Sequence, residues 1–416
     1  MSDLSHTTRT DTFQKRIAKR YASERRFKMA GLAAVLFSVA VLAFLLITMG
    51  YNGIAGFQRT ELVVEIDFAQ SGISGDPAVL AQRNAVQSLE TQGLPEVVRQ
   101  AAEQSLGAEA ADEANPDAWR DVAHRIISDP SVLHEKSTFY LPATNGLANA
   151  YAGDGSPRLE VIADRLAAEG KLEKNFDLGF LIRSDATDPQ LTGIWGALKG
   201  SILTMLVTLA FAFPVGILAA LYLEEYAPKN RWTDLIEVSI NNLAAVPSII
   251  FGLLGLAVFL TIFPSYRSAP LIGGLTLALM TMPVIVISGR NAIKAVPPSI
   301  RDGALAIGAS PIQVVFHHVL PLALPGIMTG TIIGMARALG ETAPLLMIGM
   351  RAFVATPPDG LTSPATVLPV QIFLWSDEIN RGFIERTSAA IIVLLLFLLV
   401  MNGLAIYLRN RFEKKW

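Results

Sequence analysis

Two charged residues, Arg337 and Glu341, lie four positions apart in the stretch ARALGETAP, which is embedded in apolar sequence. No Asp, Glu, Lys or Arg occurs from 303 to 336 or from 342 to 350. A spacing of four places both side chains on one helix face, within reach of each other. An arginine guanidinium binds phosphate-like oxyanions through two parallel hydrogen bonds, and the carboxylate can neutralise it when no anion is bound. The pair predicts an anion-binding group; the alternative is an ion pair that locks two helices or lies near a membrane interface.

The elements that hold this pair are predicted to be membrane spans. The 416 residues are 51% hydrophobic and 17% charged, and a helix needs about 20 apolar residues to cross a bilayer. The charge-free windows are 29–50, 200–223, 238–266, 268–289, 303–336 and 387–408. The fifth window contains three prolines, so we expect its first half to be an extramembrane loop and its second half a helix that runs to about Gly349. The sequence therefore predicts six spans, with no cleaved signal peptide.

Helix stabilisation alone is a poor reason for the Arg337–Glu341 pair. Each charge deep in a bilayer costs roughly 2.5–3.5 kcal/mol on insertion scales, and arginine before glutamate is the less favourable order on a helix. Small residues recur every four positions before the pair, at Gly326, Gly330, Gly334 and Ala338. Such a ridge lets another helix approach closely. Both charges lie about 20° from the ridge at 100° per residue, so we expect them to point into packed protein.

The charges that flank the spans predict the orientation of the chain. The leader before Met29 is rich in Lys and Arg, and the tail RNRFEKKW is also basic. Lysine and arginine near span ends favour the cytoplasmic side. Six spans place both termini on the same side, so we expect both to be cytoplasmic and residues 51–195 to lie outside.

Residues 51–195 have the pattern of a folded domain with a net charge of −11, from 22 acidic and 11 basic residues. TELVVEIDF (60–68) alternates as a strand does, and FDLGFLIR (176–183) is a second strand candidate. Helical spacing is present at 76–90, 94–106, 117–127 and 157–173. We expect an α/β fold with the two strands paired. It shows no catalytic constellation, and we interpret His124 and His134 as surface or packing residues.

The segment between the fourth and fifth spans, about 290–325, predicts a short helix outside the membrane. The helix is expected from Ser299 to Ala306, ending near Gly308, with Pro311 beginning the next one. Its small residues suit a groove on another protein; the alternative is a plain connector. Three elements of this segment fall on a known spacing, namely Asp302-Gly303-Ala304, Gly308, and His318 followed by Leu320-Pro321.

That spacing resembles the pattern of permease subunits of ATP-binding-cassette (ABC) importers, which is Glu-Ala-Ala, three residues, Gly, nine residues, Ile, one residue, Leu-Pro. Asp replaces Glu, Gly replaces the first Ala, and His replaces Ile in this chain. In that family the loop is the coupling helix that fits the ATPase subunit. The resemblance therefore implies that Asp302, Gly303, Ala304 and Gly308 contact an ATPase.

Two further stretches, RALGETAPLL and NNLAAVPSIIFGLLGL, resemble signatures of phosphate-specific ABC permeases, and most closely the A-type subunit. The match spans roughly 200–409. It implies that Arg337 and Glu341 lie in the phosphate path. Thr342, Asn242 and Ser248 are further candidates as neutral hydrogen-bond donors; alternatively, Pro247 and Ser248 only kink the third span and satisfy its backbone. The leader and external domain resemble an N-terminal extension of some long members.

The resemblance implies an all-α polytopic protein with six transmembrane helices of the type I ABC importer permease fold and an α/β extracytoplasmic domain between helices 1 and 2. The predicted parts are a cytoplasmic leader (1–28), helix 1 (29–50), the external domain (51–195) and the permease domain (196–416). Implied partners are a second permease in a heterodimer, two ATPase subunits that carry ATP and Mg, an extracytoplasmic phosphate-binding protein and membrane lipid. We expect the chain itself to bind no cofactor or metal. The stretch GKL at Gly170 is not a P-loop, because it lacks the second glycine and the Ser or Thr that phosphate and magnesium binding require.

Other functions remain open at this point. Sulfate or molybdate could replace phosphate as the substrate of a bacterial inner-membrane importer. A membrane-anchored sensor should carry a cytoplasmic signalling domain, and a membrane enzyme needs a nucleophile or metal cluster; neither is evident in the sequence. The chain has no cysteine and no basic stripe with interleaved aromatics, which argues against nucleic acid binding.

Overall fold

The structure is a computed structural model that describes residues 4–68, 71–73, 75–76, 80–82, 84–350 and 353–412. Two compact units make up the chain, Met1–Asn52 and Gly53–Trp416. The first three residues of the predicted leader and the last four of the basic tail lie outside the described residues. Helix α1 (Leu4–Gly56) is a single helix of 53 residues that contains the first predicted span.

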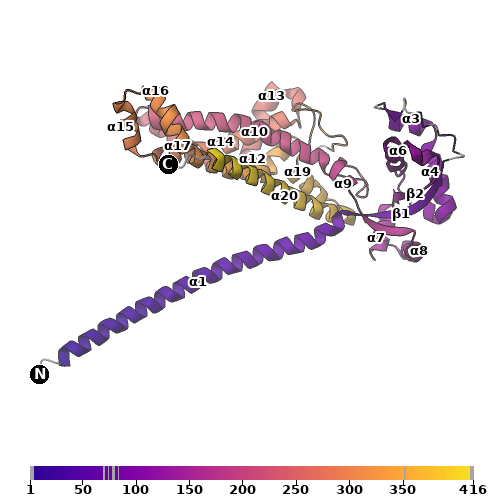
Figure 1. The fold of residues 1–416 in the computed structure, drawn as a ribbon, viewed down its shortest axis with the longest axis horizontal. Coiled ribbons are helices and arrows are strands. Elements are labelled where there is room, and N and C mark those ends of the chain that lie inside the picture. Colours follow the sequence, from indigo (N-terminus) through magenta and orange to yellow (C-terminus); the bar gives the residue numbers. More distant parts are fainter. Residues whose placement is uncertain are drawn as a thin grey trace. The chain divides into compact units, whose positions relative to one another are not determined.

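The external domain is built on a three-stranded antiparallel sheet in the order β2-β1-β3. Its strands are β1 (Gln58–Asp67), β2 (Lys136–Pro142) and β3 (Leu172–Phe176). Its helices are α3 (Ala85–Thr91), α4 (Leu94–Leu106), α5 (Ala108–Ala111), α6 (Trp119–Ser128), α7 (Asn145–Tyr151) and α8 (Pro157–Ala168). Leu62, Val64 and Ile66 of β1 are fully buried in the core that these helices share with the sheet. The α/β prediction is confirmed (Figure 1).

The prediction of a strand at 176–183 was wrong. Gly170 adopts a positive φ of 68° and ends the preceding helix, so the chain enters β3 earlier, at Leu172. The predicted segment instead forms the short helix α9 (Gly179–Ile182), whose Phe180 is fully buried among permease residues. Phe180 packs into a core of the permease part, and this burial outweighed the alternating pattern of the segment.

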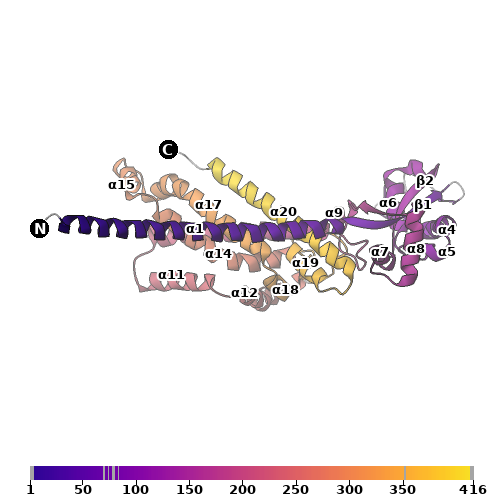
Figure 2. The ribbon, with the colours of Figure 1, turned by 90° about the horizontal axis from the view of Figure 1, so that it is seen from below.

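The permease part is a bundle of long apolar helices (Figures 1 and 2). They are α10 (Trp195–Leu221), α11 (Arg231–Ala244), α12 (Ser248–Leu254), α14 (Pro270–Lys294), α17 (Leu320–Gly340) and α20 (Arg381–Phe412). Shorter elements are the π-helix η2 (Tyr222–Tyr226), α15 (Pro298–Ala306), α16 (Pro311–Gln313), the π-helix η5 (Val314–Val319), α18 (Ala343–Met347) and α19 (Leu368–Ser376). Among the described residues five helices are long and apolar enough to cross a membrane, or six if the bent pair formed by α11 with α12 counts as one span.

Two predicted spans differ from their expected form. The third is bent by 105° between α11 and the segment that begins with α12, because Pro247 lacks an N–H and disfavours helix at the residue before it. The fifth begins earlier than expected, at Pro311, and ends at Gly340 rather than near Gly349. Glu341 leaves the helix with ψ of 110°.

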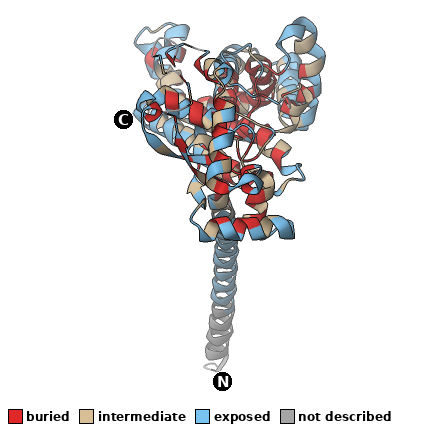
Figure 3. Cartoon of the chain, turned by 90° about the vertical axis from the view of Figure 1, so that its right-hand side faces the viewer, coloured by how far each residue is buried: buried red, intermediate tan, exposed pale blue. Residues whose placement is uncertain are grey.

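The ridge of small residues on α17 packs against α14, as the sequence predicts. A Cβ at Gly326 would lie 2.7 Å from Ala292 Cβ, and one at Gly334 would lie 2.9 Å from the Thr281 methyl group. Figure 3 shows buried residues gathered within the bundle while many outward faces are exposed. The glycines therefore set how closely α14 and α17 approach.

A buried charge cluster joins the external domain to the permease helices. Arg386, near the start of α20, donates to the Gly56 and Pro189 carbonyls at 2.8 Å and to Asp177 at 3.0 Å. Asp177 also accepts from Arg183 at 2.7 Å, and its side chain is 2% exposed. This cluster, the neck, fixes the end of α1, the 177–190 linker and α20 to one another.

Candidate functional site

Arg337 and Glu341 lie at the end of α17, where the helix stops. Arg337 Nε donates to Glu341 Oε1 at 3.4 Å. The Arg337 side chain is 48% exposed and that of Glu341 is 19% exposed. A 3.4 Å contact is long for a charged hydrogen bond, and within the part of the chain that the structure describes the guanidinium has no other hydrogen bond or ion pair.

The expectation that both charges point into packed protein was wrong for Arg337. Ala338, its neighbour on the ridge, is fully buried, and Arg337 lies on the flank of that ridge. Glu341 lies outside the helix, so the rotation of 100° per residue along an α-helix does not predict the direction of its side chain. Within the single chain, the pair lies at the edge of the helix packing rather than inside it.

The breaks in the third and fifth spans are brought together by packing. Helix α12, which begins at Ser248, packs against α18, which begins just after Thr342. A Cβ on Gly252 would lie 2.7 Å from Pro344 Cα, so the two segments are in close contact. Ser248 and Thr342 are half-buried at the starts of these segments, and Asn242 is exposed near the end of α11. The structure thus brings the candidate donors onto neighbouring elements at two helix breaks.

The segment predicted to contact an ATPase is an exposed helix at the opposite end of the bundle from the sheet (Figures 1 and 2). Asp302, Gly303 and Gly308 are exposed, and Gly308 has a φ of 90° that favours glycine. Ala304 is buried in a core cluster that also contains Val315 and Val319 of η5, so it positions the helix rather than facing outward. Leu305 and Ile307 add apolar surface, with Ile307 82% exposed.

Sequence reasoning missed a cluster of charges beside this helix. It consists of Glu224, Glu225, Glu237, Arg290, Lys294 and Arg301. The loop from 224 to 237 carries near-balanced charge, which gives a weak signal for orientation and none for pairing. The available signal was the position of Arg290 and Arg301 around the end of a span, opposite the adjacent acids Glu224-Glu225.

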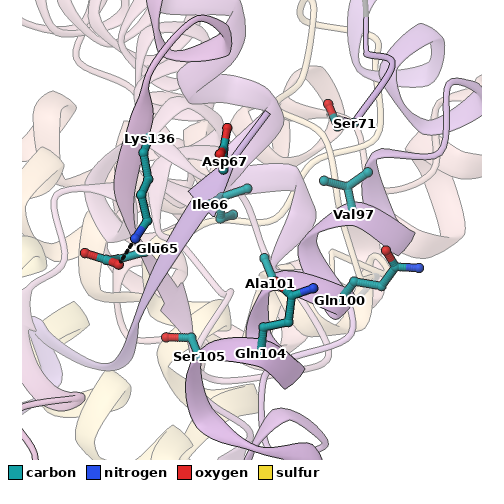
Figure 4. A pocket seen from close by; sticks show the side chains of 10 residues that line it. All are labelled: Glu65, Ile66, Asp67, Ser71, Val97, Gln100, Ala101, Gln104, Ser105 and Lys136. Carbon is teal, nitrogen blue, oxygen red and sulfur yellow. Dashed lines mark ion pairs between the residues drawn. The ribbon is translucent and has the colours of Figure 1, made fainter. Parts of the chain in front are cut away.

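The external domain contains an open cleft of about 510 Å³ between β1 and α4. Figure 4 shows Glu65, Asp67 and Lys136 on one side and Gln100 and Gln104 of α4 on the other. Lys136 pairs with Glu65 at 2.5 Å. The cleft has more acidic than basic groups, and like charge disfavours an anion, so it is not an anion-capture site.

No group of three or more His, Asp or Glu is arranged to hold a metal ion among the residues that the structure describes. Beyond the spans, one carboxyl is perturbed by burial. Burial raises the pKa of Asp185 above its ordinary value, although hydrogen bonds from Trp375 and Thr192 oppose the shift. Asp185 lies in the linker before α10, away from the helix breaks in sequence.

Comparison with known families gives two matches. Residues 212–414 match the family described as "Binding-protein-dependent transport system inner membrane component". Residues 14–160 match "Domain of unknown function (DUF3333)".

Curated relatives match at about one third identity. The chain is 31% identical over 238 residues to "Probable ABC transporter permease protein YqgI" of Bacillus subtilis (strain 168), covering 54% of this chain and 80% of that protein. It is 32% identical over 224 residues to "Phosphate transport system permease protein PstA" of Yersinia pestis, covering 54% and 73%. Among solved structures, an inward-facing MetNI methionine ABC transporter chain matches with a TM-score of 0.43 at 19% identity, over 53% of this chain and 98% of that one.

Proposed function

The chain belongs to the family of inner membrane components of binding-protein-dependent transport systems, and on this premise we propose that it is the permease subunit of an ATP-driven importer of inorganic phosphate. As a member of that family it is a transporter component and a multi-pass membrane protein. The phosphate-transport names of relatives such as the Yersinia pestis protein support the choice of substrate.

The observation that carries the proposal is the Arg337–Glu341 pair at the break between α17 and α18. Arg337 is half exposed on the single chain, and its bond to Glu341 is long at 3.4 Å. In a complete transporter this flank would face the translocation path between two permeases. The guanidinium would then bind two phosphate oxygens at once, and Glu341 would hold it between transport events.

The remaining roles follow from this assignment. Thr342, Ser248 and Asn242 would donate or accept hydrogen bonds at the two helix breaks. Asp302, Gly303, Ala304 and Gly308 would form or position the surface that an ATPase subunit contacts. The partners would be a second permease, two ATPase subunits that bind ATP and Mg, and an external phosphate-binding protein, with both termini of this chain in the cytoplasm.

The test is phosphate uptake by cells or proteoliposomes that contain the complete transporter with Arg337→Gln or Arg337→Lys. We expect Arg337→Gln to lower uptake by roughly tenfold or more, because a charged hydrogen bond contributes about 1.5–3 kcal/mol. Arg337→Lys should restore only part of it, because an ammonium group lacks the planar fork.

Two controls make this experiment decisive. Membrane abundance of each variant must equal that of the wild type. Lys229→Met, at an exposed position in the loop before α11, serves as a charge-removing control.

Wild-type uptake by both Arg337 variants at normal abundance would show that Arg337 is not part of the phosphate path. Competition by sulfate or molybdate that matches unlabelled phosphate would assign the transporter to another oxyanion.

A further inference from the structure

A cluster of six charged residues ties α15 to three other elements of the permease. We call it the inner cluster; it contains Glu224, Glu225, Glu237, Arg290, Lys294 and Arg301. Its central pair is shielded from solvent, with the side chains of Arg290 and Glu224 each 11% exposed, whereas Glu237 is 39% and Lys294 is 56% exposed. An ion pair adds little net stability when desolvation offsets its attraction or when water screens it, so the cluster is of interest for the elements that it joins.

Arg301 of α15 uses its guanidinium to make four hydrogen bonds. Nη2 and Nε donate to Glu225 Oε1 of η2 at 2.8 and 3.3 Å. Nη1 donates to the Val296 carbonyl at 2.7 Å, and Nη2 donates to the Ile293 carbonyl at 3.0 Å. These carbonyls lie at the end of α14, where the backbone oxygens favour a cation; the Ile293 carbonyl also accepts from the Val296 N–H at 3.2 Å. Arg301 therefore attaches α15 to α14 and η2 at once.

Arg290 makes the next connection. Its Nε donates to Glu224 at 2.7 Å, and its Nη2 donates to Glu237 of α11 at 2.7 Å. Glu224 and Glu225 are adjacent in the single π-helical turn η2, so that turn binds α15 through Glu225 and α14 through Glu224. A π-turn at such a position is typical of functional sites.

These contacts form a continuous physical connection from α15 to the helix breaks. Glu237 belongs to α11, the first half of the bent span, and the second half begins with α12. Helix α12 packs against α18, which follows directly after Glu341 and Thr342. A shift of α15 therefore cannot occur without moving η2 or breaking the bonds of Arg301.

We propose that Arg301 is a positioning residue for transport: it fixes α15 against η2 and α14, so that a displacement of α15 by the ATPase moves α11 through Glu225, Glu224 and Arg290. The inference rests on the proposed function, because α15 acts as a lever only if an ATPase docks on it. Lysine cannot replace Arg301, because one ammonium group cannot span a carboxylate and two carbonyls in fixed directions.

The experiment uses the complete transporter with its ATPase, in proteoliposomes, and measures phosphate uptake and ATP hydrolysis on the same preparation. The variants are Arg301→Met, Arg301→Lys, Glu225→Gln and the double variant Arg301→Met/Glu225→Gln, with Lys229→Met as the matched control. We expect phosphate transported per ATP hydrolysed to fall by about tenfold in both Arg301 variants. Glu225→Gln should lower the same ratio, and the double variant should be no worse than Arg301→Met, because both changes break one connection.

A second measurement needs no transport. The chain contains no cysteine, so Ile307→Cys, at the exposed residue that directly follows α15, provides a single cross-linking site to the ATPase subunit. We expect the yield at a fixed, short reaction time to fall several-fold when Arg301→Met is added and to stay unchanged with Lys229→Met.

Opposite results overturn the positioning role. These are a wild-type ratio of transport to hydrolysis in Arg301→Met, losses that only follow reduced membrane abundance, or additive losses in the double variant. If the wild-type complex takes up no phosphate, the proposed function fails instead, and the cross-linking yield still decides the role of Arg301.

Discussion

The arginines of this chain differ in how exposed they are and in how strongly neighbouring carboxylates pair with them. Arg337 keeps half of its side chain exposed beside a long contact to Glu341, which suits a group that must exchange partners. Arg59 of the external domain is the opposite case. Burial lowers its pKa, but Asp121, Asp177 and Glu61 outweigh burial and raise the pKa above its ordinary value, so this arginine stays charged as a permanent structural group.

Asp185 allows a prediction about pH. Because burial raises the pKa of its carboxyl, the folded chain binds this proton more tightly than the unfolded chain. Ionisation of Asp185 therefore destabilises the folded chain. This destabilisation is absent below about pH 3.9, the pKa of the carboxyl in the unfolded chain, and it grows as the pH rises through the pKa in the folded chain. We expect Asp185→Asn to be at least as stable as the wild type at neutral pH, and its advantage to vanish toward pH 4. Melting temperature in detergent between pH 4 and 8 measures this.

The control for that series is Glu90→Gln, which removes an exposed carboxyl of the external domain and should change stability at neutral pH by no more than about 0.5 kcal/mol, as exposed substitutions usually do. A constant loss of stability in Asp185→Asn across the pH range would contradict the prediction. It would mean that the amide cannot accept the hydrogen bonds from Trp375 and Thr192 as the carboxyl does, whatever the protonation state of that carboxyl.

At the scale of secondary structure elements, part of the fold could be predicted from the sequence. Five of the six predicted spans, the strand at Thr60, the small-residue ridge and the helix at Ser299–Ala306 follow local patterns, and the structure has them, whereas the third span is a bent pair of helices. The bend at Pro247 and the end of α17 at Gly340 depend on which segments pack together, since a proline or a polar residue is compatible with either a straight or a broken span. The Arg301–Glu225 and Arg386–Gly56 contacts join residues that are 76 and 330 positions apart, and no local pattern reports such pairings.

At the level of helix packing, Gly330 is the critical contact between α17 and α14. A Cβ there would lie 1.8 Å from Ser288 Oγ and 2.2 Å from Ser288 Cβ. We expect Gly330→Ala to destabilise the protein by about 1–3 kcal/mol, the usual cost of overpacking. Thermal unfolding in detergent measures the effect.

Two variants test the cause of that effect. Gly403→Ala on α20 has open space at the Cβ position and should be neutral or slightly stabilising, since alanine favours helix. Ser288→Gly should rescue Gly330→Ala by removing the colliding side chain. A loss in Gly330→Ala that Ser288→Gly does not reduce would contradict the packing explanation.

For the whole molecule, the neck decides whether the external domain is rigidly attached. Asp177 accepts from both Arg183 and Arg386 while almost fully buried. Asp177→Asn leaves the buried Arg386 and the partly buried Arg183 short of a counter-charge, so we expect a loss of about 3–5 kcal/mol, the typical cost of breaking a buried pair. Limited proteolysis of membrane vesicles should then show faster cleavage in the 177–190 linker.

The control is Arg99→Met, which breaks exposed pairs with Glu96 and Glu103 on α4 and should leave the cleavage rate unchanged. Equal cleavage rates for Asp177→Asn and Arg99→Met would show that the neck is not what holds the domain.

The donors of Arg386 limit how this chain can be shortened. Among the described residues its three side-chain nitrogens donate to Pro189, Gly56 and Asp177, and all three acceptors precede α10. A shortened chain that kept Arg386 but lacked residues 57–190 would carry a stranded cation at the head of its final helix, because Asp177 and Pro189 would be gone. Removal of the external domain therefore requires replacement of Arg386 at the same time.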